Sequence, residues 1–214
     1  MEHTELEVVE QQVTGLSANV FSDPKAFQGL MRIATQFASS GIVPDQYKGK
    51  PIDCAIAIDM ANRMGEGISP IFVMQNLYIV KGKPSWSGQA CMSMINGSKK
   101  YKNVRPVYTG EKMTNSWGCH IEAENVKTGE IIKGTEITIA IAKAEGWYDK
   151  PGSKWKTLPQ QMLAYRAAAF FARVYIPNAL MGCAVENEGD DIASQKTAPE
   201  IKNVFGGVAS DSDK

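Results

Sequence analysis

Residues 153–173 read SKWKTLPQQMLAYRAAAFFAR and carry the strongest structural signal in the chain. A helix is predicted to begin here, because Thr157 offers a capping hydroxyl and Gln160, three residues later, can bond back to the cap residue. Pro159 fits the first turn of such a helix. Apolar and alanine residues continue to Tyr175, and Pro177 ends the pattern because proline cannot continue a helix. The stretch therefore predicts one long helix in the C-terminal part of the chain.

Two arginines of this helix, Arg166 and Arg173, are seven residues apart. Seven residues make two helical turns, so both side chains leave the helix along nearly the same line with a rise of about 10 Å. The residues between them are apolar, so both arginines lie beside a buried face. Guanidinium groups in that setting need anionic partners. Internal ion pairs with Asp or Glu and contacts with phosphate are both open at this point.

The distribution of charge favours an anionic partner. The 214 residues include 23 Lys+Arg and 23 Asp+Glu, and 43% are hydrophobic, which suits one globular domain of zero formal charge. Residues 1–80 carry 5 basic and 9 acidic side chains, residues 81–173 carry 15 and 7, and residues 174–214 carry 3 and 7. A basic middle segment thus lies between two acidic ends, and a zero total does not exclude nucleic acid.

Cations and aromatic residues share the loops of this basic segment, a mixture typical of polynucleotide binding because cations contact phosphates and flat rings contact bases. The alternative interpretation is a solvated surface with its tryptophans in the core. The clusters are Lys81 and Lys83 at a hairpin, Lys99, Lys100, Lys102 and Arg105 around Tyr101, and Lys154 and Lys156 beside Trp155.

The remaining chain shows both helical and strand periodicity, which predicts an α+β fold with an antiparallel β-sheet, a β-hairpin and packed helices. The expected helices run from Ser22-Asp23-Pro24 to Gly41, from Ile52 to Met64 with Ala55, Ile56, Met60 and Met64 facing inward, and from Gly88 to Gly97. The expected strands are a hairpin across Lys81-Gly82-Lys83, then Val104–Tyr108, Trp117–Val126 and Ile131–Ala142.

The two ends are predicted to lie outside the core. We expect a flexible acidic arm over residues 1–21, a single core domain over 22–191 and a disordered acidic tail over 192–214. No stretch approaches the roughly 20 apolar residues of a membrane span, and no signal peptide is recognisable. A cytoplasmic protein without a membrane partner, with its four cysteines reduced and mostly buried, is therefore expected.

Residues that could carry out catalysis are sparse. There is no phosphate-binding glycine loop and no paired zinc ligands, so neither ATP, a metal nor a catalytic residue is expected. Glu122 and Glu124 would share one strand face, and an acidic cluster follows the core. These carboxylates support an alternative function, a magnesium-dependent DNA nuclease. The simpler interpretation is that the two glutamates lie on a solvent-exposed face of the sheet and that the cluster belongs to a solvated tail. The cluster consists of Glu186, Glu188, Asp190 and Asp191.

Three stretches resemble the RecT family of phage recombinases, and the resemblance covers roughly Asp23 to Asp191. They are Ala61–Pro70, which ends in Gly-x-Gly-x-Ser-Pro, then Val73–Pro84 (VMQNLYIVKGKP), and Ser153–Arg173, which is the most similar of the three. The resemblance implies the fold shared by RecT, Redβ and the eukaryotic annealing proteins.

The activity implied by this resemblance is ATP-independent annealing of complementary single DNA strands in phage-type homologous recombination, by an oligomeric ring or helical filament. It requires no cofactor, and Mg²⁺ is at most a modulator. The implied partners are single-stranded DNA, the annealed duplex intermediate, further copies of the chain, a phage exonuclease and a host single-strand-binding protein. A phage structural or scaffold protein with an incidental basic strip is a third alternative.

The resemblance also implies which residues bind DNA. The hairpin from Gln75 to Trp86, with Lys81 and Lys83, would border the groove, and Arg166 and Arg173 would contact phosphates. The wall of the groove would be formed by Lys154, Trp155 and Lys156. The basic cluster of Lys99, Lys100, Lys102 and Arg105 completes the set of expected DNA-binding residues.

Overall fold

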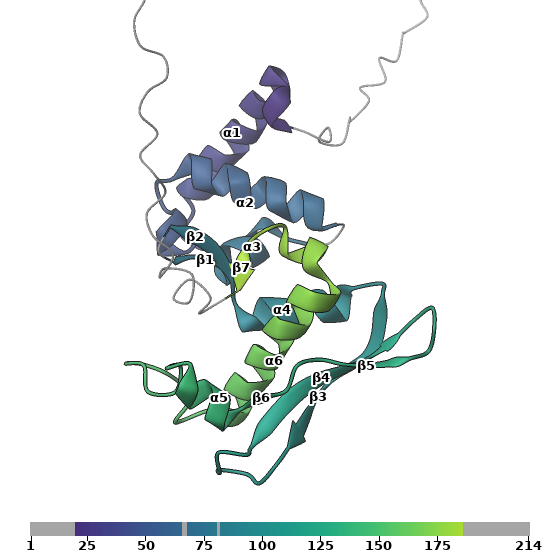
Figure 1. Cartoon of the computed structure of the whole chain (residues 1–214). Helices are drawn as coiled ribbons and strands as arrows, with labels where there is room; N and C mark the ends of the chain where they lie inside the picture. The colour runs from purple at the N-terminus through teal and green to yellow at the C-terminus, as the bar shows by residue number, and fades with distance from the viewer. Residues whose placement is uncertain (1–19, 66–67, 81, 186–214) are drawn as a thin grey trace, which may run out of the picture.

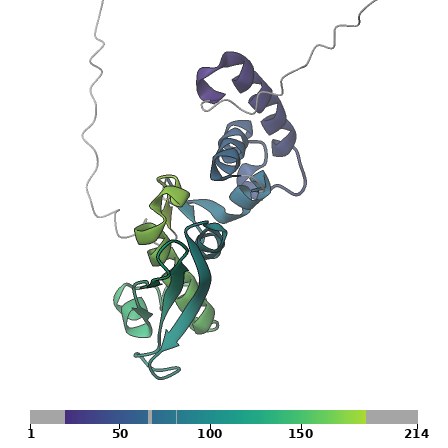
Figure 2. The ribbon, with the colours of Figure 1, turned by 90° about the vertical axis from the view of Figure 1, so that its right-hand side faces the viewer.

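The computed structural model describes residues 20–65, 68–80 and 82–185, and it has a mixed α+β fold. The helices are α1 (Pro24–Ala38), α2 (Pro51–Met64), α3 (Pro70–Asn76), α4 (Gly88–Gly97), α5 (Ile139–Ala144) and α6 (Pro159–Tyr175). The strands are β1 (Leu77–Val80), β2 (Lys83–Trp86), β3 (Tyr101–Thr109), β4 (Gly118–Asn125), β5 (Ile131–Lys133), β6 (Ile137–Thr138) and β7 (Ala184–Val185). The first helices and the β3–β4–β5 sheet lie at opposite ends of the molecule (Figures 1 and 2).

The N-terminal helices follow the predicted pattern. The Asp23 side chain accepts hydrogen bonds from the backbone N–H groups of Lys25 at 2.9 Å and Ala26 at 3.3 Å, which confirms the predicted start of α1. Gly65, with a φ of 119°, ends α2 as predicted. The prediction that Ile56 faces inward is wrong, since its side chain is 45% exposed. Helix α3 was not predicted.

The predicted hairpin is confirmed, because β1 and β2 pair antiparallel from Leu77 opposite Trp86 onward. Strand β7 adds to β2 in parallel, a pairing that the sequence did not predict. Trp86 is fully buried, and its indole Nε1 donates a hydrogen bond to the Leu180 carbonyl at 3.0 Å. The hairpin is thereby tied to the segment that follows α6.

The larger sheet contains β3, β4 and β5 in antiparallel order, with β6 also paired to β4. The predicted strand Ile131–Ala142 is wrong over its second half, where the chain forms α5. The Thr138 hydroxyl accepts a hydrogen bond from the Ile141 backbone N–H at 3.2 Å and so caps this helix. Alternate alanines after Thr138 favour the helix further, because alanine has the highest helix propensity.

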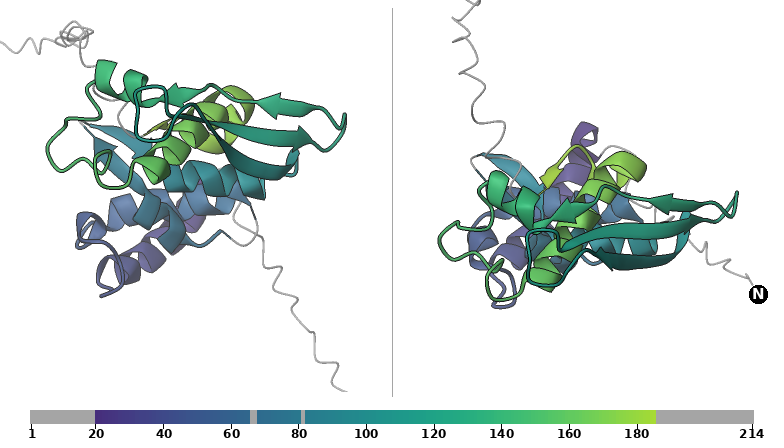
Figure 3. Two further views of the ribbon diagram at one scale, coloured as in Figure 1. Left: turned by 90° about the horizontal axis from the view of Figure 1, so that it is seen from below. Right: turned by 60° about the horizontal axis from the view of Figure 1, so that its bottom comes forward.

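Helix α6 packs on α4 and on one face of the larger sheet (Figure 3). Phe171 is fully buried, and its ring lies 5.5 Å from the ring of Tyr101 in an edge-on arrangement. The predicted capping of α6 is wrong, because Leu158 is its N-cap and makes no side-chain capping bond. The chain continues beyond α6 through a 3-10 turn, Pro177–Leu180, to β7.

The predicted arm lies outside the described residues except for Val20 and Phe21, which belong to a 3-10 turn. The predicted tail and residues 186–191 of the predicted core also lie outside them. Within the described part of the chain, no helix has the length and apolar character needed to cross a membrane. The four cysteines form no disulfide there, and three of them are buried.

Gly88 allows α4 and α6 to approach closely, because a Cβ atom at this position would lie 2.6 Å from the Tyr165 Cβ. We expect Gly88→Ala to lower the free energy of unfolding by about 1–3 kcal/mol through overpacking, measured by urea denaturation. Gly29→Ala is the control: Gly29 lies in α1 with open space around it, so this variant should be neutral or slightly stabilising. Equal effects of the two substitutions would contradict the close contact.

Candidate nucleic-acid interface

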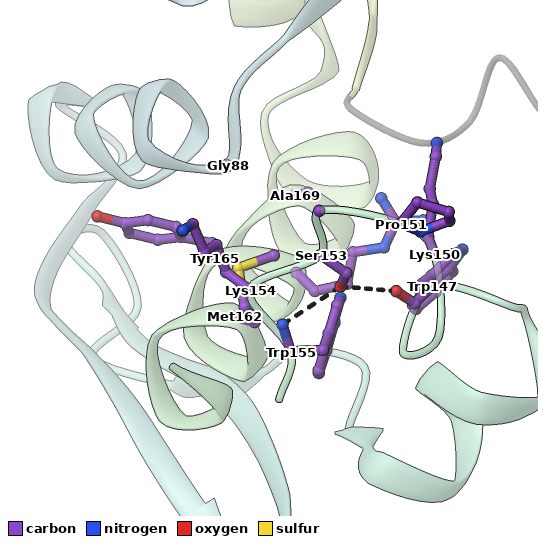
Figure 4. A pocket seen from close by; sticks show the side chains of 12 residues that line it. Gly88, Trp147, Lys150, Pro151, Ser153, Lys154, Trp155, Met162, Tyr165 and Ala169 are labelled. Atoms are coloured by element: carbon purple, nitrogen blue, oxygen red, sulfur yellow. Dashed lines mark hydrogen bonds between the residues drawn. The ribbon is translucent and has the colours of Figure 1, made fainter. Parts of the chain in front are cut away.

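A hollow of about 320 Å³ lies between the loop before α6 and the helix itself (Figure 4). Lys150 and Lys154 enter it from the loop, and Arg166 enters from the helix. Gly88, the first residue of α4, lies at its edge. None of the described residues that line it is acidic. The hollow is therefore an electropositive concave surface, suited to a negatively charged ligand.

Hydrogen bonds and aromatic packing determine the shape of this loop. The Ser153 hydroxyl donates to the Trp147 carbonyl at 2.9 Å and accepts from the Trp155 backbone N–H at 3.3 Å (Figure 4). The two indole rings lie nearly parallel, 6.3 Å apart, and both side chains are buried. Trp155 thus belongs to the core, and its ring is not exposed for stacking on a base.

Arg166 is buried against aromatic rings. Its Cζ atom lies 3.7 Å from the centroid of the Trp147 ring and 5.5 Å from that of Phe170, and the residue is 6% exposed. A guanidinium group over an indole face is stabilised by the negative potential of the ring. Arg173 is exposed, and its Cζ atom lies 5.8 Å from the centroid of the same Phe170 ring. Both guanidinium groups therefore lie beside Phe170, consistent with the shared line predicted from their spacing.

A second hollow, of about 460 Å³, lies at the C-terminal end of α6. It is lined by Arg173 and, from the hairpin, by Lys83. Lys83 and Arg173 are 90 residues apart in the sequence, and the β2–β7 pairing brings their segments together. We call Lys154, Arg166, Arg173 and Lys83 the basic line, because they follow α6 from the first hollow to the second.

The other predicted hairpin residues have different surroundings. Gln75 is exposed at the end of α3, and its backbone carbonyl accepts a hydrogen bond from the Tyr78 hydroxyl at 3.0 Å. Trp86 is fully buried, so its ring cannot contact a ligand on the surface. Lys81 lies outside the described residues.

The predicted cluster around β3 does not join the basic line. Along β4, Cys119, Ile121 and Ala123 are buried, whereas Glu122 and Glu124 alternate with them and face away from α6. Lys102 pairs with Glu124 at 2.8 Å, and Arg105 pairs with Glu122 at 3.0 Å. These cations therefore belong to the outer face of the sheet.

Further cations of this region also have local partners. The Lys100 Nζ donates to the Tyr175 carbonyl at 3.1 Å, and the exposed Lys99 lies in the turn before β3. Lys156 pairs with Asp149 at 2.8 Å. Glu122 also contacts His120 at 3.4 Å and Lys133 at 3.5 Å. Trp147, Lys150 and Phe170 also lie at the interface, and none of them was predicted to bind DNA, although residues 145–156 are rich in aromatic and basic side chains.

In the ranges that the structure describes, no group of three His, Cys, Asp or Glu side chains could hold a metal ion. The acidic cluster from Glu186 to Asp191 lies outside those ranges. Comparison of the chain with family models, curated proteins and solved structures finds no match.

The ion pairs of the outer sheet face make stability depend on pH. Arg105 lowers the pKa of Glu122, and Lys102 lowers that of Glu124. A carboxyl whose pKa is lower in the folded state stabilises the protein above its ordinary pKa of 4.5, and this stabilisation disappears as the pH falls through the folded-state pKa. The parent should therefore lose stability below about pH 4.5.

The variant that combines Glu122→Gln with Glu124→Gln should lose less stability than the parent over that acid range, measured by urea denaturation at several pH values. Glu130→Gln, at the exposed β4–β5 turn, is the control and should follow the parent. If the double variant and the parent showed the same acid dependence, these pairs would not stabilise the fold.

Arg166 and Lys154 should differ in their effect on stability. Arg166→Ala removes the buried contact with Trp147 and should lower the free energy of unfolding by about 2 kcal/mol or more. Lys154 is exposed, so Lys154→Ala should change it by less than about 0.5 kcal/mol. Tryptophan fluorescence during urea denaturation measures both. A stable Arg166→Ala variant would refute the structural role of Arg166.

Proposed function

We propose that this protein binds single-stranded DNA along the basic line and anneals complementary strands without ATP. The observation that supports this proposal is the convergence of four cations from a loop, a helix and a hairpin along one side of α6. Arg166 and Arg173 lie two turns apart, which gives a spacing of about 10 Å along the helix. Phosphates of an extended strand would contact Lys154, Arg173 and Lys83, and the buried Arg166 would add its positive charge to the potential between them.

The burial of Trp86 and Trp155 suggests how such a strand would be held. With these two rings in the core, the contacts along the basic line would be made to phosphates and not by stacking on the bases. Binding through phosphates is independent of sequence and strongly dependent on salt. It would leave the bases exposed for pairing with an incoming strand, which is what annealing requires.

The proposal includes membership in the RecT group of annealing proteins, with its fold and its assembly into a ring or helical filament. Two of the three stretches that resemble this family, residues 73–84 and 153–173, contribute every cation of the basic line. The corresponding partners are an exonuclease and a host single-strand-binding protein in the bacterial cytoplasm. No cofactor or catalytic residue is part of the proposal.

The nuclease alternative has less support from the geometry. Cleavage with magnesium needs carboxylates that converge on a metal ion, whereas Glu122 and Glu124 contact cations from neighbouring strands. The scaffold alternative predicts oligomers without affinity for DNA, so a binding experiment separates it from the main proposal.

The binding surface is tested by a triple variant that combines Lys83→Ala, Lys154→Ala and Arg173→Ala. Arg166 is left intact because it supports the loop. Loss of three phosphate contacts should reduce the slope of log affinity against log salt by about 2 for a single strand. The matched control combines Lys102→Ala, Arg105→Ala and Lys133→Ala on the outer sheet face, and should bind like the parent. Equal losses in both variants would contradict the proposed surface.

The activity is tested with labelled complementary oligonucleotides and the parent protein, in magnesium and without nucleotide. We expect the oligonucleotides to anneal faster than without protein and to keep their length. Shortened products would indicate a nuclease. Absence of any affinity for single-stranded DNA would refute the proposed function and favour the scaffold alternative.

A further inference from the structure

A third hollow, of about 590 Å³, lies at the start of α6 and is separate from the basic line. Its walls come from the β3–β4 loop and from residues 156–161. The segment 154–158 separates it from the first hollow: Lys154 and Trp155 line the first, whereas Lys156, Thr157 and Leu158 line the third. One short basic segment thus divides two concave surfaces.

The lining of the third hollow combines cations with exposed apolar side chains. Lys112 extends over the ring of Trp117, with its Nζ 5.8 Å from the centroid, and Lys156 contributes a second cation. The side chains of Met113 and Leu158 are 71% and 49% exposed. None of the described residues that line the hollow is acidic.

Lys156 is available to a ligand in spite of its partner. It pairs with Asp149, and the two side chains are 59% and 69% exposed. Exposed ion pairs contribute at most about 1 kcal/mol, so a phosphate can replace this carboxylate. The outer sheet face differs, because Glu122 and Glu124 there are mostly covered and hold several cations at once.

The rim of the third hollow is held in place by its own hydrogen bonds. Gly110 has a φ of +68°, and a Cβ atom there would lie 2.0 Å from the Ser116 carbonyl oxygen, so the turn requires glycine. The Thr114 hydroxyl donates to the Glu111 carbonyl at 2.8 Å. The Tyr108 hydroxyl donates to the Gln160 carbonyl at 3.2 Å, which links β3 to α6. Lys112 and Met113 therefore project from an ordered loop.

We propose that the third hollow is a second binding site for single-stranded nucleic acid, which receives the incoming strand during annealing. Lys112 and Lys156 contact its phosphates, as the cations of single-strand sites do, and the exposed apolar side chains of Met113 and Leu158 contact the faces of its bases. This inference rests on the proposed function, since it assigns the first strand to the basic line. The segment 154–158 then lies between the two strands and brings them side by side.

The test is a variant that combines Lys112→Glu with Lys156→Glu. Its affinity for one unpaired oligonucleotide should stay within about twofold of the parent, whereas the rate of annealing to a complementary strand should fall by at least about tenfold, because the reversed charges repel the second strand. The matched control, Lys25→Glu with Lys127→Glu, reverses two exposed lysines in α1 and in the β4–β5 turn and should anneal like the parent.

A second variant, Met113→Ser with Leu158→Ser, leaves the charge unchanged. It should also anneal more slowly than the parent while keeping the parent's affinity for one unpaired oligonucleotide. It also decides the question if the charge-reversal variant fails to fold. A parallel loss of single-strand affinity and annealing would assign the hollow to the path of the first strand, and unchanged annealing would leave it without a role; either result overturns the inference. A parent protein that binds no single strand would instead overturn the proposed function.

Discussion

The contact of α6 with α4 and with the larger sheet is the packing on which the candidate interface depends. Most of the central residues of α6 are alanines, and five of them are buried, which allows the neighbouring backbones to approach closely. Gly88 on α4 serves the same purpose from the opposite side. Phe171 fills the space between α6 and β3. Because these contacts cover most of the helix, Arg173 and the aromatic pair Trp147 and Phe170 define the side that remains for a ligand.

The burial of Arg166 connects this packing to the proposed interface. A guanidinium group removed from water needs compensating contacts, and the faces of Trp147 and Phe170 supply them. The same contacts hold the loop before α6 against the helix and so form the first hollow. Arg166 therefore contributes to the interface first by positioning the loop, and its positive charge adds to the potential of the hollow.

Local signals predicted a large part of the fold. The Asp23 cap, the hairpin and the bounds of α4 depend on residues close together in the sequence, and the structure agrees with them. The helix α5 was missed because alternating isoleucines fit a strand as well as they fit the short capped helix that forms. The burial of the aromatic residues was harder to predict. A tryptophan between lysines has the same sequence pattern whether it packs in the core, like Trp155, or lies on the surface.

The basic line was predictable only in part. The spacing of Arg166 and Arg173 placed them together, because helix geometry is local. The meeting of Lys83 with Arg173 depends on the parallel β2–β7 pair, a contact between distant segments that no local pattern shows. For the same reason the ion pairs of Lys102 and Arg105 with β4 could not be foreseen, and these cations were assigned to DNA.

The most direct test of this account is a map of lysine reactivity. The protein would be acetylated with and without a single-stranded oligonucleotide, and the modified lysines would be quantified by mass spectrometry. The account predicts that the oligonucleotide protects Lys83 and Lys154, whereas Lys102 and Lys133 on the outer sheet face react equally in both samples. Protection of Lys102 and Lys133 without protection of Lys83 and Lys154 would contradict it.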